Sequence, residues 1–193
     1  LQTLSRGRLG ADEARRRHAE AMILLGFAIE IYWLQLREGR HFLHEHPAAA
    51  LSWKEEIVAK LRLDPRVADI VGDQCRYGLR AKGPSGTWRP ARKPTRFLSS
   101  SEEILDKLSL RCRGVHLHQT LLGGGRASAA AIYPPGLCKA ILEGTEAQLR
   151  RDRGTLPASV QKALGDGTGL YDFDSPPAAR LPPSGSLGTI VGE

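Results

Sequence analysis

The sequence lacks most features that mark a membrane, secreted or disulfide-bonded protein. No apolar run reaches the roughly 20 residues that a membrane-spanning helix needs, and residues 1–17 do not have the pattern of a secretory signal. The cysteines Cys75, Cys112 and Cys138 are an odd number with no short pair spacing, which argues against a disulfide framework. We therefore expect an intracellular protein in a reducing compartment.

The chain is basic. Its 193 residues carry 28 Lys and Arg against 21 Asp and Glu, a formal net charge of +7. This excess favours an anionic partner, with nucleic acid first, although a solvated basic surface without a partner explains it equally well. The length is sufficient for one domain with a hydrophobic core.

Hydrophobic periodicity predicts alternating helices and strands. Apolar residues at three- and four-residue steps predict a long helix over residues 11–38. Ser52 followed by Glu55 is typical of a capping box that opens a second helix. The remaining predicted elements are strands at 41–44, 67–71 and 95–99, a hairpin or long loop around 83–90, and helices at 101–110 and 134–151.

This order predicts part of a mostly parallel α/β sheet. We expect a doubly wound, Rossmann-like sheet that lacks its N-terminal half. The expected segments are a loop at 1–10, the α/β segment at 11–153 and a disordered Gly/Pro-rich tail at 154–193. Glu45 comes just before Pro47, which should end its strand, so its carboxylate should lie at the carboxyl end where such sheets bind ligands.

Three segments in this order resemble the C5-cytosine DNA methyltransferases: FLHEHP (42–47), DIVGDQCRYGL (69–79) and RKPTRFLSS (92–100). The resemblance implies that Glu45 contacts a flipped cytosine and that Tyr77 with Gly78 matches an aromatic-glycine pair of the substrate site. It also implies that Arg92 or Arg96 helps to hold the activated base. The chain departs from the family at His46-Pro47, and it lacks the Gln of the third motif.

Segments of this kind also occur in the polyproteins of copia-type retroelements. The third segment followed by Cys112, the His116-x-His118 pair, GGGRA and YPP looks closer to those elements than to a cellular enzyme. The family's Pro-Cys nucleophile turn and Gly-rich S-adenosylmethionine loop are absent, and both are needed for methyl transfer. The resemblance therefore implies a truncated, inactive DNA methyltransferase-like domain of a transposable element.

The resemblance also sets the expected partners. The domain would retain nucleic-acid binding, and its missing N-terminal half or polyprotein would be a further partner. S-adenosylmethionine is the cofactor of the family but is not expected to bind this chain alone. No membrane partner is expected.

A second hypothesis is a zinc-stabilised structural or nucleic-acid-binding module. Cys112, His116 and His118 lie within seven positions, and Cys75 could join them through the fold. Thiolates and neutral imidazoles are the usual zinc ligands, and alternation along a strand would place both histidines on one side. Because the spacing is not that of a compact zinc finger, we favour a buried cysteine beside two strand-borne histidines over a metal site.

The densest basic cluster consists of Arg89, Arg92, Lys93 and Arg96. One hypothesis is that it contacts phosphates, with Arg96 on the base side. The other is a solvated edge strand that its charges protect from aggregation. Trp88, in the polar loop beside Arg89, is the better exposed candidate for stacking on bases.

Overall fold

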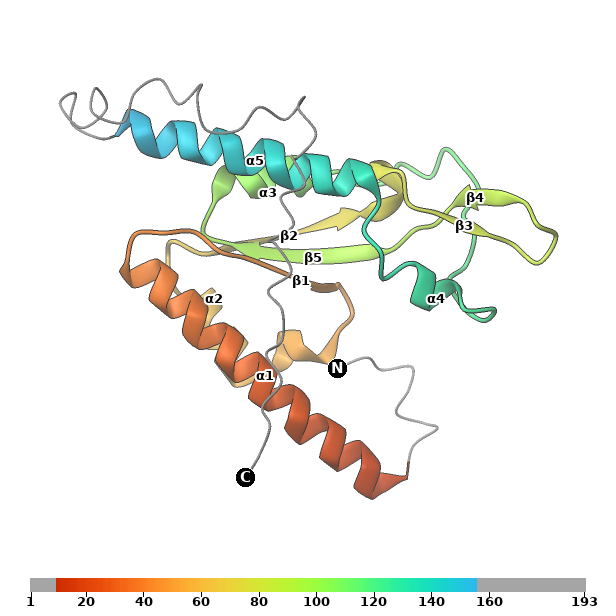
Figure 1. Cartoon of the computed structure of the whole chain (residues 1–193), viewed down its shortest axis with the longest axis horizontal. Coiled ribbons are helices and arrows are strands. Elements are labelled where there is room, and N and C mark those ends of the chain that lie inside the picture. The colour runs from red at the N-terminus through yellow and green to blue at the C-terminus, as the bar shows by residue number, and fades with distance from the viewer. Residues whose placement is uncertain (1–9, 156–193) are drawn as a thin grey trace, which may run out of the picture. The chain divides into compact units, whose positions relative to one another are not determined.

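The computed structural model describes residues 10–155. Residues 1–9 and 156–193 lie outside the described part, and with them nearly all of the predicted N-terminal loop and Gly/Pro-rich tail. The chain divides into two units, Leu1–Arg153 and Gly154–Glu193. Everything described below belongs to the first unit, apart from the last residue of its final helix (Figure 1).

The first unit is a mixed α/β structure, as the alternating pattern predicts. Its elements, in chain order, are α1 (Ala11–Arg37), β1 (Leu43–Pro47), η2 (Leu51–Lys54), α2 (Glu56–Arg62), β2 (Ala68–Asp73), η3 (Gln74–Tyr77), β3 (Arg80–Lys82), β4 (Trp88–Pro90), β5 (Pro94–Ser99), α3 (Glu102–Leu108), α4 (Arg126–Ala129) and α5 (Pro135–Gly154).

The sheets are antiparallel, so the predicted parallel, doubly wound arrangement is wrong for the described residues. The main sheet has the order β1-β5-β2, and β5 runs antiparallel to both neighbours. The strands β3 and β4 form a separate antiparallel ribbon. Hydrophobic runs mark where strands occur but not which way their partners run, because pairing direction depends on distant segments.

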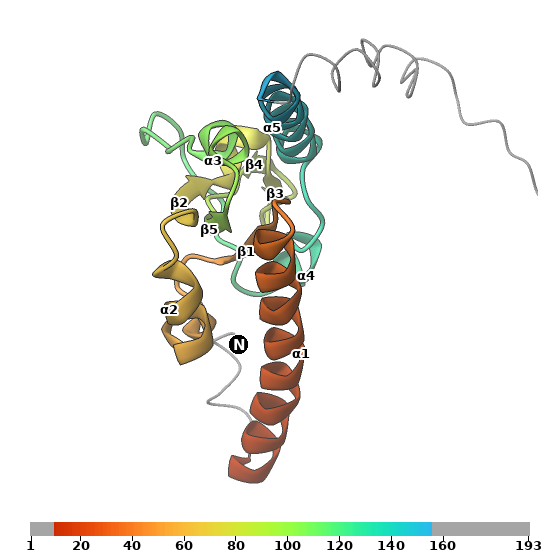
Figure 2. The ribbon, with the colours of Figure 1, turned by 90° about the vertical axis from the view of Figure 1, so that its left-hand side faces the viewer.

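The central strand β5 serves two cores at once. Successive strand residues point to opposite faces, and its neighbours Phe97 and Leu98 are both fully buried. Leu98 packs in a cluster with residues of α1 and α2, whereas Phe97 packs in a cluster with residues of α3 and α5. Figures 1 and 2 accordingly show α1 and α2 on one side of the sheet and α3 and α5 on the other.

A serine caps α3 close to the predicted start of that helix, whereas the predicted serine cap of α2 does not form. The Ser101 hydroxyl accepts a hydrogen bond from the Ile104 N–H (3.2 Å) and caps α3. Ser52 does not cap α2, which starts at Glu56. Ser52 lies inside the short helix η2, which precedes α2. Its hydroxyl forms a 2.6 Å hydrogen bond with Nδ1 of His46.

Helix α1 carries apolar side chains on two opposite faces. Leu25, Ile29 and Leu36 are buried, whereas Ile23 and Phe27 are mostly exposed. Among residues 10–155, α1 is the one helix long and apolar enough to cross a membrane by length and composition, a test that core helices also pass. α1 meets this test of length and mean hydropathy although Glu20 and Glu30 interrupt its apolar run.

A buried histidine makes the fold sensitive to acid. His44, on β1, lies against the Trp53 ring, and its Nδ1 is 3.1 Å from the Tyr32 hydroxyl. Burial, with a smaller contribution from the nearby His46, lowers the pKa of His44 from its usual 6.5 to about 4. The unfolded chain therefore takes up a proton at a higher pH than the folded chain does.

We expect the free energy of unfolding to fall by about 3 kcal/mol through this residue as the pH drops from about 6.5 to about 4. Replacement His44→Phe should flatten the pH dependence in this window. Denaturant unfolding of the native and His44→Phe chains at several pH values between about 4 and 6.5, at the same zinc concentration, measures the difference in pH dependence. Equal slopes in the two chains would contradict the assignment to His44.

Candidate metal centre

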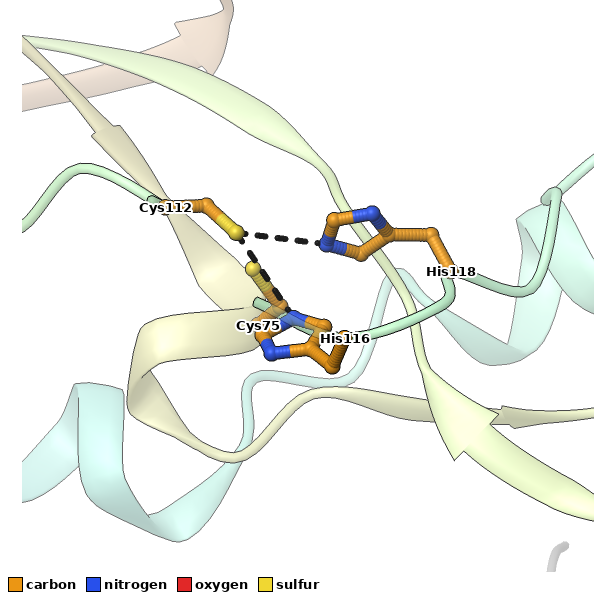
Figure 3. A group of neighbouring side chains, drawn as sticks. All are labelled: Cys75, Cys112, His116 and His118. Atoms are coloured by element: carbon orange, nitrogen blue, oxygen red, sulfur yellow. Dashed lines mark hydrogen bonds between the residues drawn. The ribbon is translucent and has the colours of Figure 1, made fainter. Parts of the chain in front are cut away.

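Four potential metal ligands converge beyond the C-terminal end of β2. One ligand atom from each of Cys75, Cys112, His116 and His118 can be chosen so that all four lie within 4.8 Å of one another. Cys75 comes from η3, and the other three come from the loop that follows α3. Figure 3 shows the two thiols and the two imidazole rings turned toward a common centre.

The distances within this group suit a tetrahedral metal ion. Sγ of Cys112 lies 3.6 Å from Nε2 of His116 and 3.4 Å from Nε2 of His118. A tetrahedral ion bonded to sulfur at about 2.3 Å and to nitrogen at about 2.0 Å holds the two atoms about 3.5 Å apart. The two sulfurs and two nitrogens therefore form a group that could hold a metal ion without a large rearrangement.

The buried carboxylate of Asp73 joins the two arms of the cluster. Asp73 ends β2, two residues before Cys75, and its side chain is fully buried. Its Oδ2 accepts a hydrogen bond from the Cys112 N–H (2.9 Å). Arg92 at 3.4 Å and Arg111 at 3.2 Å also pair with it, so a charge that would be costly to bury alone has three partners.

Two further hydrogen-bonded contacts fix the loop at either side of the ligands. The Tyr77 hydroxyl donates to the carbonyl of Lys107 and accepts from the N–H of Leu110, both at 3.0 Å. Gln119, next to His118, donates its N–H to the carbonyl of Pro90 on β4 (2.8 Å). The ligand loop is therefore attached to α3 at one end and to the β3–β4 ribbon at the other.

Two of the potential ligands have shifted pKa values. Burial and the neighbouring Cys112 thiol raise the pKa of Cys75 to about 11. Burial, His116 and Arg92 lower the pKa of His118. At neutral pH the imidazole of His118 is therefore ready to bind a cation, whereas Cys75 must lose a proton to the solvent when a metal binds.

The residues predicted from the methyltransferase resemblance do not form one site. Glu45 lies opposite Phe97 in the sheet register, and Arg96 lies one position away on β5, so the two side chains leave opposite faces. Arg96 pairs with Asp69 at 2.6 Å. Tyr77 lies beyond the end of β2, at the same end of the sheet as the end of β1, but it is buried in the core beneath α5.

The predicted basic cluster is also divided. Arg89 and Arg92 are exposed, and Arg92 is close enough to His118 to affect its pKa, whereas Nζ of Lys93 donates to the carbonyl of Ala130 (3.0 Å). Lys93 lines a separate cavity of about 640 Å³ together with Glu45 and Tyr133. The Tyr133 hydroxyl donates to Oε2 of Glu45 (2.7 Å), so Glu45 and Lys93 share a site from which Arg89 and Arg92 are separate.

The sequence prediction named three of the four ligands and raised Cys75 as the fourth, but it preferred a site without metal. It missed Asp73. The available signal was the order Asp73-Gln74-Cys75 directly after a strand rich in β-branched residues, where a short polar side chain can bond the backbone of a neighbouring loop. The partner loop lies almost forty residues later, and only the fold brings the two together.

Comparisons with protein-family models, with curated proteins and with solved structures found no match. The functional argument therefore depends on the geometry of the cluster and on the charges around it.

Replacement Asp73→Asn should lower the affinity for a divalent metal about 10- to 100-fold, because it removes the charge that holds both arms in place. Competition with a chromophoric chelator measures this affinity. The matched control is Asp69→Asn, which removes another arginine-paired carboxylate of β2, outside the cluster. Equal affinities of the two variants would show that Asp73 has no special effect on the site.

Proposed function

We propose that this chain is a zinc-stabilised nucleic-acid-binding module. The observation that carries the proposal is the convergence of Cys75, Cys112, His116 and His118 within the most basic part of the chain. Two sulfur and two nitrogen ligands with tetrahedral spacing favour zinc over magnesium or calcium, which prefer oxygen ligands. Four protein ligands leave no open coordination position, so the zinc would be structural rather than catalytic.

The region around the cluster has little hydrophobic core of its own. The third buried cluster of the protein consists of Leu79, Ala81, Ala91 and Ala130, so three of its four members are alanines. In the ligand loop, Val115 and Leu117 are 85% and 75% exposed. Small units that cannot bury enough apolar surface are commonly held together by a metal ion or by disulfides. Zinc would supply this stabilisation here.

The charge distribution supports nucleic acid as the partner. Residues 74–101 contain seven Lys and Arg, residues 107–142 contain five, and neither segment contains Asp or Glu. Seven of these side chains are exposed on η3, on the β3–β4 ribbon, just before β5 and in the ligand loop: Arg76, Arg80, Lys82, Arg89, Arg92, Arg111 and Arg113. We call them the basic set.

The metal itself would not reduce the positive charge of this region. One Zn²⁺ with two thiolates and two neutral imidazoles is a group of zero net charge. Arg92 and Arg111 share the one buried carboxylate of Asp73, which leaves an excess of positive charge beside the cluster. Such an excess attracts phosphates and releases counterions when they bind.

The resemblance to C5-cytosine methyltransferases of retroelements stays a prediction. It agrees with nucleic-acid binding as a function. The zinc module is the better supported proposal, because Glu45 and Arg96 lie on opposite faces of the sheet whereas the four metal ligands lie together.

We expect one zinc ion per purified chain. Replacement Cys112→Ser or His118→Asn should lower the bound zinc to a small fraction of this value and make the protein less stable. Elemental analysis after dialysis, together with thermal unfolding, measures both effects. The matched control is Cys138→Ser, because Cys138 is an exposed cysteine outside the cluster. Full zinc content in the Cys112→Ser chain would contradict the proposed site.

Binding to nucleic acid should weaken steeply as salt is added. The double replacement Arg89→Ala with Arg113→Ala should raise Kd and lower the slope of log K against log salt by about 1.5, as expected for the loss of two phosphate contacts. The double replacement Lys54→Ala with Lys60→Ala removes the same charge from η2 and α2 and should leave the slope unchanged. Equal effects of the two pairs would mean that total charge alone causes binding.

A further inference from the structure

The β3–β4 ribbon presents one tryptophan beside two cations on a single face. In its register, Lys82 lies opposite Trp88, and Arg80 lies opposite Pro90. Residues directly opposite in an antiparallel pair share a face, as do residues two apart on one strand. The side chains of Arg80, Lys82 and Trp88 therefore leave the ribbon on the same side. All three are exposed.

The other side of the ribbon contains the residue that packs against the rest of the protein. Ala81, between Arg80 and Lys82, is buried in the small cluster with Leu79, Ala91 and Ala130. The face with Trp88 is consequently the outer face. Trp88 is 57% exposed, whereas Trp53 is buried and Trp33 packs against the core of α1 and α2.

Hydrogen bonds around the ribbon hold the backbone at Trp88 in place. The Arg80 guanidinium donates to the carbonyl of Trp88 (3.0 Å). At the tip, the Gly83 N–H donates to the carbonyl of Thr87 (2.9 Å) and the Gly86 N–H donates to the carbonyl of Gly83 (3.0 Å). Gly86 has a φ of +82°, which a residue with a side chain rarely adopts. The ribbon is thus a folded platform rather than an extended loop.

An exposed indole with two cations beside it suits single-stranded nucleic acid. Unpaired bases stack on aromatic rings, while Lys and Arg beside the ring contact the phosphates that follow the base. In a duplex the faces of the bases are covered by their neighbours, so the indole would have no ring to stack on unless a base is unstacked.

We infer that Trp88, with Arg80 and Lys82, forms a stacking site for an unpaired base of single-stranded nucleic acid. This inference rests on the proposed nucleic-acid binding and adds the class of nucleic acid and the residue that selects it. The basic set supplies affinity that is independent of strandedness, and the Trp88 ring supplies the preference for unpaired bases.

The test compares an oligothymidine with a duplex of equal length on the full chain loaded with zinc. Trp88→Ala should weaken binding of the oligothymidine about 5- to 100-fold and change duplex binding little. Trp88→Phe should retain much of the affinity, since Phe can still stack. Zinc content and circular dichroism verify that the variants are folded.

Tryptophan fluorescence gives a second and independent readout. The oligothymidine should quench the emission of the native chain, because the stacked indole is Trp88. The Trp88→Phe chain should bind without this quenching, since the emission of Trp33 and Trp53 comes from residues that pack in the core.

The outcomes separate this inference from the proposed function. If the native chain binds neither probe at low salt, the proposed nucleic-acid binding is wrong. If it binds both probes equally and Trp88→Ala changes neither, the basic set binds nucleic acid and the stacking site does not exist. Quenching that persists in Trp88→Phe would also overturn the stacking assignment.

Discussion

The arrangement of the candidate site depends on one buried anion, the carboxylate of Asp73. It lies at the end of β2, and its partners come from two other segments: Arg92 from the residues before β5, and Arg111 with the Cys112 N–H from the loop after α3. A buried charge is tolerated only when it is paired and hydrogen-bonded. The need to satisfy this one group therefore fixes where the ligand loop meets the sheet.

The metal cluster lies where the hydrophobic cores end. The main sheet is covered on both faces, because Phe97 and Leu98 of β5 point into separate cores. The ribbon and the ligand loop meet outside these two cores, where Leu121 of the loop packs against the small cluster that contains Leu79 and Ala81. Packing thus stabilises the sheet, whereas polar contacts and the proposed zinc stabilise the basic region.

In this account, the elements that stabilise the protein differ from the side chains that would contact nucleic acid. Zinc bound by two thiolates and two neutral imidazoles would add no net charge, so the arginines near the cluster would keep this surface basic. A rigid ribbon held at its base by the ligand loop can present side chains without a large loss of conformational entropy on binding. The hydrogen bond between Gln119 and Pro90 is the direct link between the loop and the ribbon.

The sequence predicted local structure well and long-range structure poorly. The helix α1, the start of α3 at Ser101 and the approximate positions of β2 and β5 follow from periodicity and capping, which depend on near neighbours. The antiparallel order of the sheet depends on pairings between residues 48 to 56 apart for β1 with β5 and 21 to 31 apart for β2 with β5. Cys75 and Cys112 are likewise distant in sequence, so their residue types suggest a shared site, but only the fold brings the two thiols together.

The central claim is that two sulfurs and two nitrogens of this chain hold one zinc ion. X-ray absorption at the zinc edge of the purified protein tests this most directly, since it reports the elements and distances around the metal. The account predicts about two sulfur atoms near 2.3 Å and about two nitrogen atoms near 2.0 Å. A zinc shell of oxygen or nitrogen without sulfur would contradict it.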